Sequence, residues 1–157
     1  MRQTATMPVP VVHHPDYTFA LPARHPFPME KFRVLREQLG AFGDELAWHQ
    51  PVAVALQDLE RVHHTAYLQA LSNGTLEPAA QRRSGFPWST ALVRRVRLET
   101  GGTLLAAQLA LAEGLALNSA GGTHHAFSRR GLGFCVLNDV AVAVEALRRS
   151  GRGPEQV

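Results

Sequence analysis

The stretch LALNSAGGTHH, from Leu115 to His125, joins an apolar run to two glycines and two adjacent histidines. A short apolar run bounded by glycines is typical of a buried β-strand. The two glycines allow the backbone to turn tightly after the strand. In open α/β sheets ligands bind outside the carboxyl ends of the strands, so this stretch predicts a strand that delivers His124 and His125 to a site.

A long helix is expected before this strand. Ser89 is placed to cap a helix that runs to about Glu113, with apolar residues at helical spacing. The second half of that helix is apolar almost all round, which predicts burial on several sides. Gly101 and Gly102 within it each cost roughly 1 kcal/mol relative to alanine, so we expect another element to pack closely there.

Short elements fill the rest of the chain. After Cys135, Asn138 or Asp139 can cap a last helix with Val140 facing inward. The remaining elements are expected to be a strand at 9–14, a proline-rich loop at 16–28, a helix at 30–39, a helical segment from Asp58 to Leu71, and a loop at 74–88. Helices that alternate with short buried strands predict a parallel α/β sheet flanked by helices. The closing GRGPEQV ends where a further strand is expected, so the sheet is predicted to be cut off.

Composition favours a globular protein of one domain. The chain has 157 residues, 45% hydrophobic and 18% charged, with a net charge of +3. The single cysteine excludes an internal disulfide and fits a reducing cytosol. The sequence shows neither the pattern of a secretory signal nor an apolar run long enough to span a membrane. A cytoplasmic location without a membrane partner is therefore expected.

The histidine pair admits several interpretations. A pair in a turn is often only hydrogen-bonded to backbone. Adjacent side chains on extended backbone point to opposite sides, and no further ligand stands at a convincing spacing, so chelation of one metal by the pair is disfavoured. Two imidazoles that do not chelate suit proton transfer near neutral pH.

The segment GGTHHAFSRRGLGFCVLNDVAVA, residues 121–143, resembles the active-site segment of the zinc-dependent histone deacetylase superfamily. That family's signature is Gly-Gly-x-His-His-Ala, followed by Gly-Phe-Cys and Asn-Asp. The motifs RHPFPMEKFRVLRE, VHHTAYLQAL, GFPWSTALVRR and GGTLLAA agree and resemble its bacterial, class IV-like branch. The resemblance covers essentially the whole chain and implies that residues 1–157 are the N-terminal, incomplete part of a single deacetylase domain.

The resemblance implies an arginase-like, three-layer α/β/α fold and hydrolysis of an acyl-lysine or a similar acylated small amine. His125 would serve as the main general base and then acid, while His124 positions the water and stabilises charge. Gly133 and Phe134 match the family's tunnel wall beside the aliphatic stem of the substrate. Loops that resemble the rim of the pocket hold Pro26, Phe27 and Trp88.

Two further residues match supporting positions of the family. Cys135 matches the position beside the tunnel and is interpreted as a small buried hydrophobe, not a nucleophile. His63 is interpreted as a structural hydrogen-bonding residue, and its neighbour His64 fills a variable position.

The family's zinc ligands, an Asp-x-His and a more distant Asp, belong to a later part of the domain. The acidic partners of the histidines and the tyrosine that polarises the substrate carbonyl lie there too, and neither Tyr17 nor Tyr67 matches that tyrosine. The resemblance therefore implies no metal ligand in these 157 residues, no zinc bound by this chain alone, and no activity of the chain alone. A cut-off sheet further predicts marginal stability, self-association, or a complementing C-terminal part.

The sequence leaves two other classes of function to consider. The chain could be a truncated homologue that acts as a non-catalytic binding or assembly module. Nucleic-acid binding is disfavoured, because the basic excess is small and no motif for it is present. The arginines that would carry it are interpreted as a solvated face: Arg82, Arg83, Arg94, Arg95 and Arg97. The substrate stays open among acetylated proteins, polyamines and small acylated metabolites.

Overall fold

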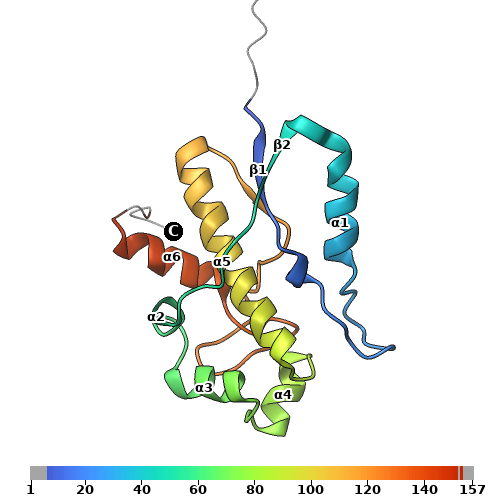
Figure 1. Ribbon diagram of the computed structural model, residues 1–157. Helices are drawn as coiled ribbons and strands as arrows, with labels where there is room; N and C mark the ends of the chain where they lie inside the picture. Colours follow the sequence, from blue (N-terminus) through green and yellow to red (C-terminus); the bar gives the residue numbers. More distant parts are fainter. Residues whose placement is uncertain (1–6, 152, 154–157) are drawn as a thin grey trace, which may run out of the picture.

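Three short parallel strands form the sheet of this protein, seen in a computed structural model that describes residues 7–151 and 153 (Figure 1). The strands are β1 (Val9–Val12), β2 (Leu46–His49) and β3 (Leu117–Asn118), and their order is β2-β1-β3. Val11 pairs with Trp48 on one side and with Leu117 on the other. The predicted parallel sheet is confirmed, although β1 ends at Val12 and β2 was not predicted.

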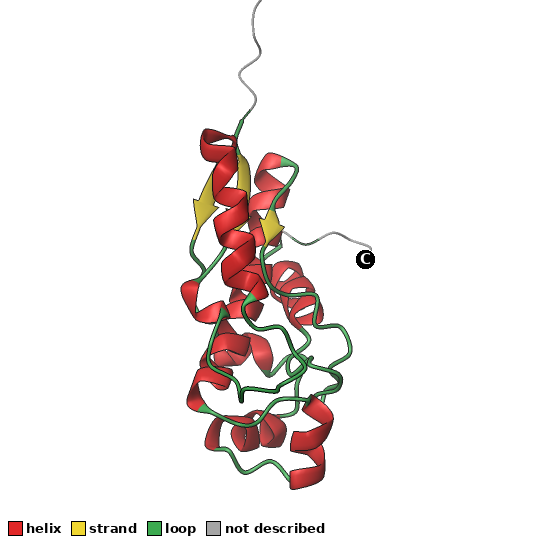
Figure 2. Ribbon diagram, turned by 90° about the vertical axis from the view of Figure 1, so that its right-hand side faces the viewer, coloured by secondary structure: helices red, strands yellow, loops and turns green. Residues whose placement is uncertain are grey.

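Helices cover both faces of this sheet. The guanidinium of Arg36, on α1, lies 3.8 Å from the ring centroid of Trp48 on β2, and α5 contacts β1 on the other side. Figures 1 and 2 show the strands between α1 and α5, with α6 beside α5. The α-helices are α1 (Lys31–Leu39), α2 (Leu56–Leu59), α3 (Thr65–Asn73), α4 (Pro78–Ser84), α5 (Thr90–Glu113) and α6 (Asp139–Arg149), and two 3₁₀ helices span Pro15–Tyr17 and Gly40–Glu45.

The long helix α5 is the central element and begins and ends where the sequence predicts. The hydroxyl of Ser89 accepts a hydrogen bond from the amide of Leu92 at 3.0 Å, and Gly114 ends the helix in the left-handed region with φ 90°. Its second half is less buried than predicted. Leu111 is 54% exposed, because no described element covers this side of the helix.

Close packing at the two glycines of α5 is confirmed. A Cβ on Gly101 would overlap the carbonyl oxygen of Val52, and one on Gly102 would overlap the hydroxyl of Tyr17. The loop after β2 and the segment after β1 therefore approach the helix backbone directly. The close contact of these segments with α5 explains why Gly101 and Gly102, which weaken a helix, occupy these positions.

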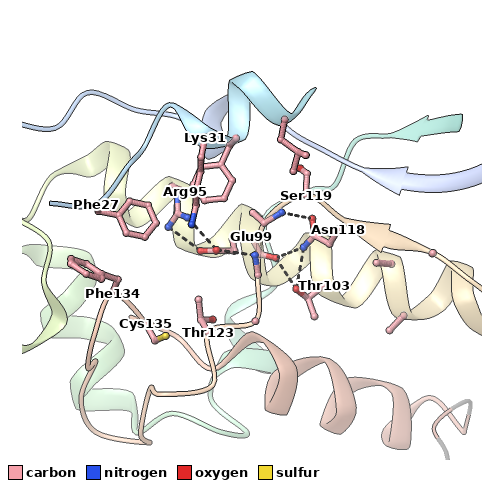
Figure 3. A pocket seen from close by; sticks show the side chains of 18 of the residues that line it. Phe27, Lys31, Arg95, Glu99, Thr103, Asn118, Ser119, Thr123, Phe134 and Cys135 are labelled. Atoms are coloured by element: carbon pink, nitrogen blue, oxygen red, sulfur yellow. Dashed lines mark hydrogen bonds and ion pairs between the residues drawn. The ribbon is translucent and has the colours of Figure 1, made fainter. Parts of the chain in front are cut away.

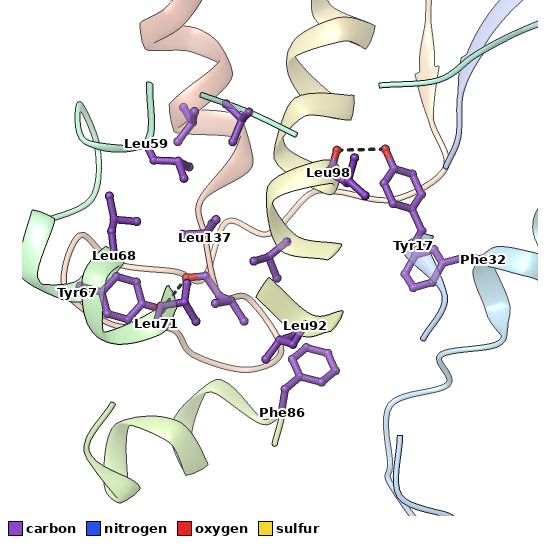
Figure 4. Close-up of a cluster of buried hydrophobic side chains, with 14 of the residues drawn as sticks. Tyr17, Phe32, Leu59, Tyr67, Leu68, Leu71, Phe86, Leu92, Leu98 and Leu137 are labelled. Carbon is purple, nitrogen blue, oxygen red and sulfur yellow. Dashed lines mark hydrogen bonds between the residues drawn. The ribbon is translucent and has the colours of Figure 1, made fainter. Parts of the chain in front are cut away.

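The hydrophobic core lies around α5 and the loop before α6 (Figure 4). Leu92 and Val142 are fully buried within it. Tyr67 spans this core and donates its hydroxyl hydrogen to the carbonyl oxygen of Val136 at 2.8 Å. Burial raises the pKa of the Tyr67 phenol, so this hydroxyl stays a hydrogen-bond donor at all ordinary pH values.

Three local predictions are wrong. The segment predicted as one helix from Asp58 is two helices, because the chain turns at His64, whose amide bonds the carbonyl oxygen of Ser128 at 2.8 Å. The loop predicted at 74–88 contains α4, which begins at Pro78 and ends at the left-handed Gly85. Val140, predicted to face inward, is 43% exposed. Of the two caps that the sequence allows for α6, the structure selects Asn138, whose side chain accepts from the amide of Ala141, and not Asp139.

No helix among the described residues has the length and apolar character needed to cross a membrane.

Replacement of Gly101 by alanine is expected to destabilise the protein by at least about 2 kcal/mol. The gain in helix propensity is only about 1 kcal/mol, whereas the new methyl group would push the backbone at Val52 away. Gly40→Ala is the matched control, since Gly40 has φ −58° and its nearest neighbour would lie 3.6 Å from the new carbon. Urea unfolding of both variants checks this, and equal stability of Gly101→Ala and Gly40→Ala would contradict the packing described here.

Candidate active site

The turn that carries the histidine pair begins directly after β3, and a buried carboxylate holds it. Asp139, the first residue of α6, is fully buried. Its Oδ2 accepts from the amide of Gly122 at 2.9 Å, and its Oδ1 accepts from the amide of Thr123 at 2.7 Å. The hydroxyl of Thr103 on α5 donates to its Oδ2 at 2.5 Å, and the Thr123 hydroxyl lies 2.7 Å from its Oδ1 and 2.5 Å from the carbonyl oxygen of Leu137, to only one of which it can donate. These contacts supply hydrogen-bond partners to a carboxyl group that has no exposed surface.

A second buried carboxylate, that of Glu99 on α5, bonds Gly121, the residue before Gly122 in the same turn. Its Oε1 accepts from the amide of Gly121 at 3.0 Å. Arg95 lies one turn earlier on α5, with its Nη1 3.0 Å from the Glu99 Oε2, and both side chains are buried (Figure 3). Burial raises the pKa of the Glu99 carboxyl, while the charge of Arg95 opposes that rise. Two helices thus bind three consecutive backbone amides of one turn.

A polar chain connects this turn to the sheet. Asn118 on β3 donates from its Nδ2 to the Thr103 hydroxyl at 3.1 Å and accepts from the Tyr17 hydroxyl at 3.1 Å. Tyr17 is fully buried, and its backbone carbonyl accepts from the Nε of Arg95 at 3.0 Å. The end of β3 and the segment after β1 are therefore fixed to the same helix face as the turn.

His124 and His125 lie exposed just beyond this turn, with ring centroids 4.3 Å apart. The Nδ1 of His124 lies 2.9 Å from the carbonyl oxygen of Gly122. Because a carbonyl only accepts, Nδ1 carries the hydrogen, and the Nε2 of the neutral ring is left as an acceptor. The side-chain Nδ2 of Asn138 donates to the carbonyl oxygens of His124 and Ala126, at 3.4 and 3.2 Å.

A pocket of about 940 Å³ opens beside the turn (Figure 3). Gly133 and Phe134 line it, and so do Phe27 and Cys135. The rings of Phe27 and Phe134 lie 5.2 Å apart and form an aromatic wall. Further lining residues come from the turn and from α1, α5 and β3: Lys31, Phe32, Arg95, Glu99, Asn118 and Gly121 among them.

Phe134 holds an unusual backbone conformation in this wall. Its φ of 67° lies in the left-handed region, which bulky residues seldom adopt. Two hydrogen bonds keep it there: Gly133 donates to the carbonyl oxygen of Arg83 at 3.1 Å, and Phe134 donates to that of Ser84 at 3.0 Å. Strain of this kind persists where surrounding contacts impose it, and it gathers at functional sites.

The two other residues predicted for the rim lie elsewhere. Trp88 does not line this pocket, since its indole Nε1 donates to the carbonyl oxygen of Leu71 at 2.7 Å and its ring covers Gly74. Pro26 is exposed beside Phe27 and contributes no lining surface.

Cys135 and His63 take the structural places expected of them. Cys135 is buried, and burial raises the pKa of its thiol, which disfavours the nucleophilic thiolate. The Nε2 of His63 accepts from the amide of Asn138 at 2.9 Å, and its Nδ1 donates to the carbonyl oxygen of Phe127 at 3.1 Å. His63 therefore bridges the two ends of the loop that follows the pair.

The described residues do not fit a zinc site. No group of three His, Cys, Asp or Glu side chains among them is arranged to hold a metal ion. The acids nearest the pair are already engaged, Asp139 by amides and hydroxyls and Glu99 by Arg95 and Gly121.

The interpretation of the arginines as a solvated face is wrong at Arg95, which is 2% exposed. Arg97 is half-buried and donates to the carbonyl oxygen of Val54 at 3.0 Å, whereas Arg82, Arg83 and Arg94 are exposed. Sequence reasoning missed Arg95 and Glu99 as site residues. Their separation of four positions on a predicted helix was the available signal, because such pairs face one another.

Comparison with known proteins identifies the family. Residues 25–156 match the histone deacetylase domain, and the chain belongs to this family. It is 49% identical over 148 residues to an uncharacterised protein of Picosynechococcus, covering 92% of this chain and 49% of that protein. It is 31% identical to the acetoin utilization protein AcuC of Bacillus subtilis, covering 88% of this chain and 39% of that one.

A crystal structure of a histone deacetylase homologue from Aquifex aeolicus has the same fold, with a TM-score of 0.72 at 24% identity. The match covers 92% of this chain and 42% of that one. The chain thus spans about half or less of the length of the relatives it matches.

Stability is expected to fall as the pH drops below about 6.5, in part through His63. Burial lowers the pKa of His63 in the folded protein below its ordinary 6.5, and protonation of Nε2 would break its bond with Asn138. The unfolded chain therefore binds the proton first, so the stabilisation is complete above pH 6.5 and is lost as the pH falls. Burial also lowers the pKa of His13, and this adds to the loss of stability as the pH falls.

Urea unfolding between pH 7.5 and 5 checks this. His63→Gln should reduce the pH dependence, and the control His64→Asn, at an exposed position where Asn still caps α3, should keep it. A slope that is the same in His63→Gln and in the unaltered chain would disprove the role of His63.

Proposed function

We propose that this chain supplies the proton-transfer pair and part of the substrate wall of a deacetylase that hydrolyses acyl-lysine or similar acylated amines in the cytoplasm. One observation carries the proposal: two exposed imidazoles lie 4.3 Å apart at the end of a turn whose residues Gly121 to Thr123 line a pocket with an aromatic wall, although the two rings are not themselves among the lining residues. Membership of the histone deacetylase family supports it. Residues 1–157 then form the N-terminal part of a single deacetylase domain.

In this proposal His125 is the general base. It removes a proton from the water that attacks the amide carbon and then returns a proton to the leaving amine. His124 orients that water through Nε2, since its Nδ1 hydrogen is directed to the carbonyl of Gly122. Exposure of both rings lets a substrate reach them.

The aromatic wall serves substrate binding. Phe134 and Phe27 flank the pocket, and the apolar stem of an acyl-lysine can lie along their faces. Gly133, next to Phe134, also lines the pocket.

Histone deacetylases use zinc, which polarises the amide carbonyl and activates water. The described residues of this chain do not form a ligand set. We therefore propose that this chain binds no zinc by itself and that it is inactive without residues beyond those described.

The 157-residue chain alone is expected to show no zinc-dependent turnover of a fluorogenic acetyl-lysine peptide. The physical reason is that no set of metal ligands is arranged among the residues that the structure describes. Equilibrium dialysis with zinc and an assay at high enzyme concentration check this. Turnover that a chelator abolishes would contradict it, whereas peptide binding without turnover or zinc would favour a non-catalytic binding module.

Histidine substitutions test the roles directly. A chimera joins residues 1–153 to the second half of the Picosynechococcus relative, of which this chain matches 49%. In an active chimera His125→Ala should lower kcat about 100-fold or more, and His124→Ala should lower it too. His64→Asn is the control, and it should leave kcat unchanged. Full activity of His125→Ala would refute the proposed function.

Association is expected at the open side of the sheet. Within the described residues no strand pairs with the outer edge of β3, and Leu111, Leu115 and Leu117 are 54%, 56% and 46% exposed there. An open edge with apolar neighbours favours pairing with a second copy or a complementing part. The midpoint of thermal unfolding should then rise with protein concentration. A sharp, concentration-independent transition of a clean monomer would contradict this.

A further inference from the structure

We propose that Asp139 and Glu99 are positioning residues, whose buried carboxylates direct the backbone into the His124–His125 pair. This inference rests on the proposed function, since the pair that they position is the proton-transfer pair. The two residues act through hydrogen bonds to the turn, and Glu99 also lines the pocket.

The backbone amides of the turn are bonded to both carboxylates. Gly121 donates to Glu99 at 3.0 Å, Gly122 to Asp139 at 2.9 Å, and Thr123 to Asp139 at 2.7 Å. Three consecutive amides thus point at two carboxylates, and His124 is the next residue. An amide bonded to a buried anion is held more tightly than one bonded to a neutral acceptor.

The turn is shaped for this approach. Gly121 and Gly122 have φ of 110° and 75°, in the region that favours glycine. A Cβ on Gly121 would lie 2.6 Å from the Oδ2 of Asp139 and 2.6 Å from the hydroxyl of Thr103. The backbone can therefore reach the carboxylate only because the first residue of the turn has no side chain.

A role in capping α6 does not explain Asp139. The cap is Asn138, whose side chain accepts from the amide of Ala141 at 3.1 Å. Asp139 instead directs both oxygens away from its own helix, to the turn and to Thr103 on α5. Both oxygens are needed as acceptors, and an asparagine at this position would offer only one.

Asp139→Asn in the 157-residue chain tests the proposal. The exchange of the amide hydrogens of Gly122 and Thr123 should become about tenfold faster or more, while amides in the centre of α5 stay protected. The ¹⁵N imidazole signals of His124 and His125, and the contact between their rings, should change as well. Glu145→Gln is the matched control, an exposed acid on the same helix, and it should change none of these.

A milder pair of variants covers the case in which Asp139→Asn does not fold. Thr103→Val removes one donor to Asp139, whereas Thr103→Ser retains it. Thr103→Val should shift the same amide and imidazole signals in the same direction, and Thr103→Ser should restore them. The double variant Arg95→Met/Glu99→Gln removes both buried charges together and should speed exchange at Gly121.

Unchanged exchange and unchanged imidazole signals in folded Asp139→Asn, or in Thr103→Val, would overturn the proposal and leave Asp139 a packing residue. These readouts need no activity, so they are independent of the proposed function. In the active chimera, Asp139→Asn should lower kcat while KM stays within about twofold. If His125→Ala leaves the chimera active, the proposed function fails, but the exchange result still decides whether Asp139 orders the turn.

Discussion

The buried carboxylate of Asp139 is the interaction on which the rest of the site depends. It joins three parts of the chain that regular secondary structure does not connect: the turn after β3, the helix α5 through Thr103, and the start of α6. A charge in such a place is tolerated only when its oxygens are fully hydrogen-bonded. Each donor that is removed leaves one oxygen of a buried carboxyl group with a partner fewer, so the contacts depend on one another.

The loop between the histidine pair and α6 has little secondary structure, and its order comes from side chains of neighbouring helices. His63 and Tyr67, from the region of α3, bond its backbone at Asn138, Phe127 and Val136. The carbonyl groups at the end of α4 hold Gly133 and Phe134. Functional loops gain precision from such rigid supports, and here the supports come from elements that have no part in the proposed chemistry.

The open side of the sheet and the sparse cover of α5 have one common cause. A helix that is apolar all round needs neighbours on several sides, and the described residues supply them only along its first half. Leu111 and Leu117 stay exposed while Leu92 and Val96 are buried. The chain also spans half or less of the relatives that share its fold. The exposed side is therefore the side on which the rest of such a fold is expected to pack.

Much of this protein could be predicted from local sequence. Ser89, Gly114 and the apolar spacing between them set the limits of α5, because capping and periodicity act within a few residues. Asn138 starts α6 for the same reason. The close approach at Gly101 and Gly102 was predictable too, since two glycines inside a helix require a packing reason. The motif around His124 and His125 further identified the family.

Only the tertiary structure decided which charged groups are buried. The spacing of Arg95 and Glu99 indicates a pair but not its burial, because Arg95 bonds the carbonyl of Tyr17, 78 positions away, and Asp139 likewise bonds residues 16 and 17 positions away. The break before α3 was decided in the same way, by the bond between His64 and Ser128. The sequence also did not predict that Trp88 lies over Gly74 and away from the pocket. Local patterns determine where a helix begins and ends, whereas desolvation and long-range hydrogen bonds exist only after the elements have packed.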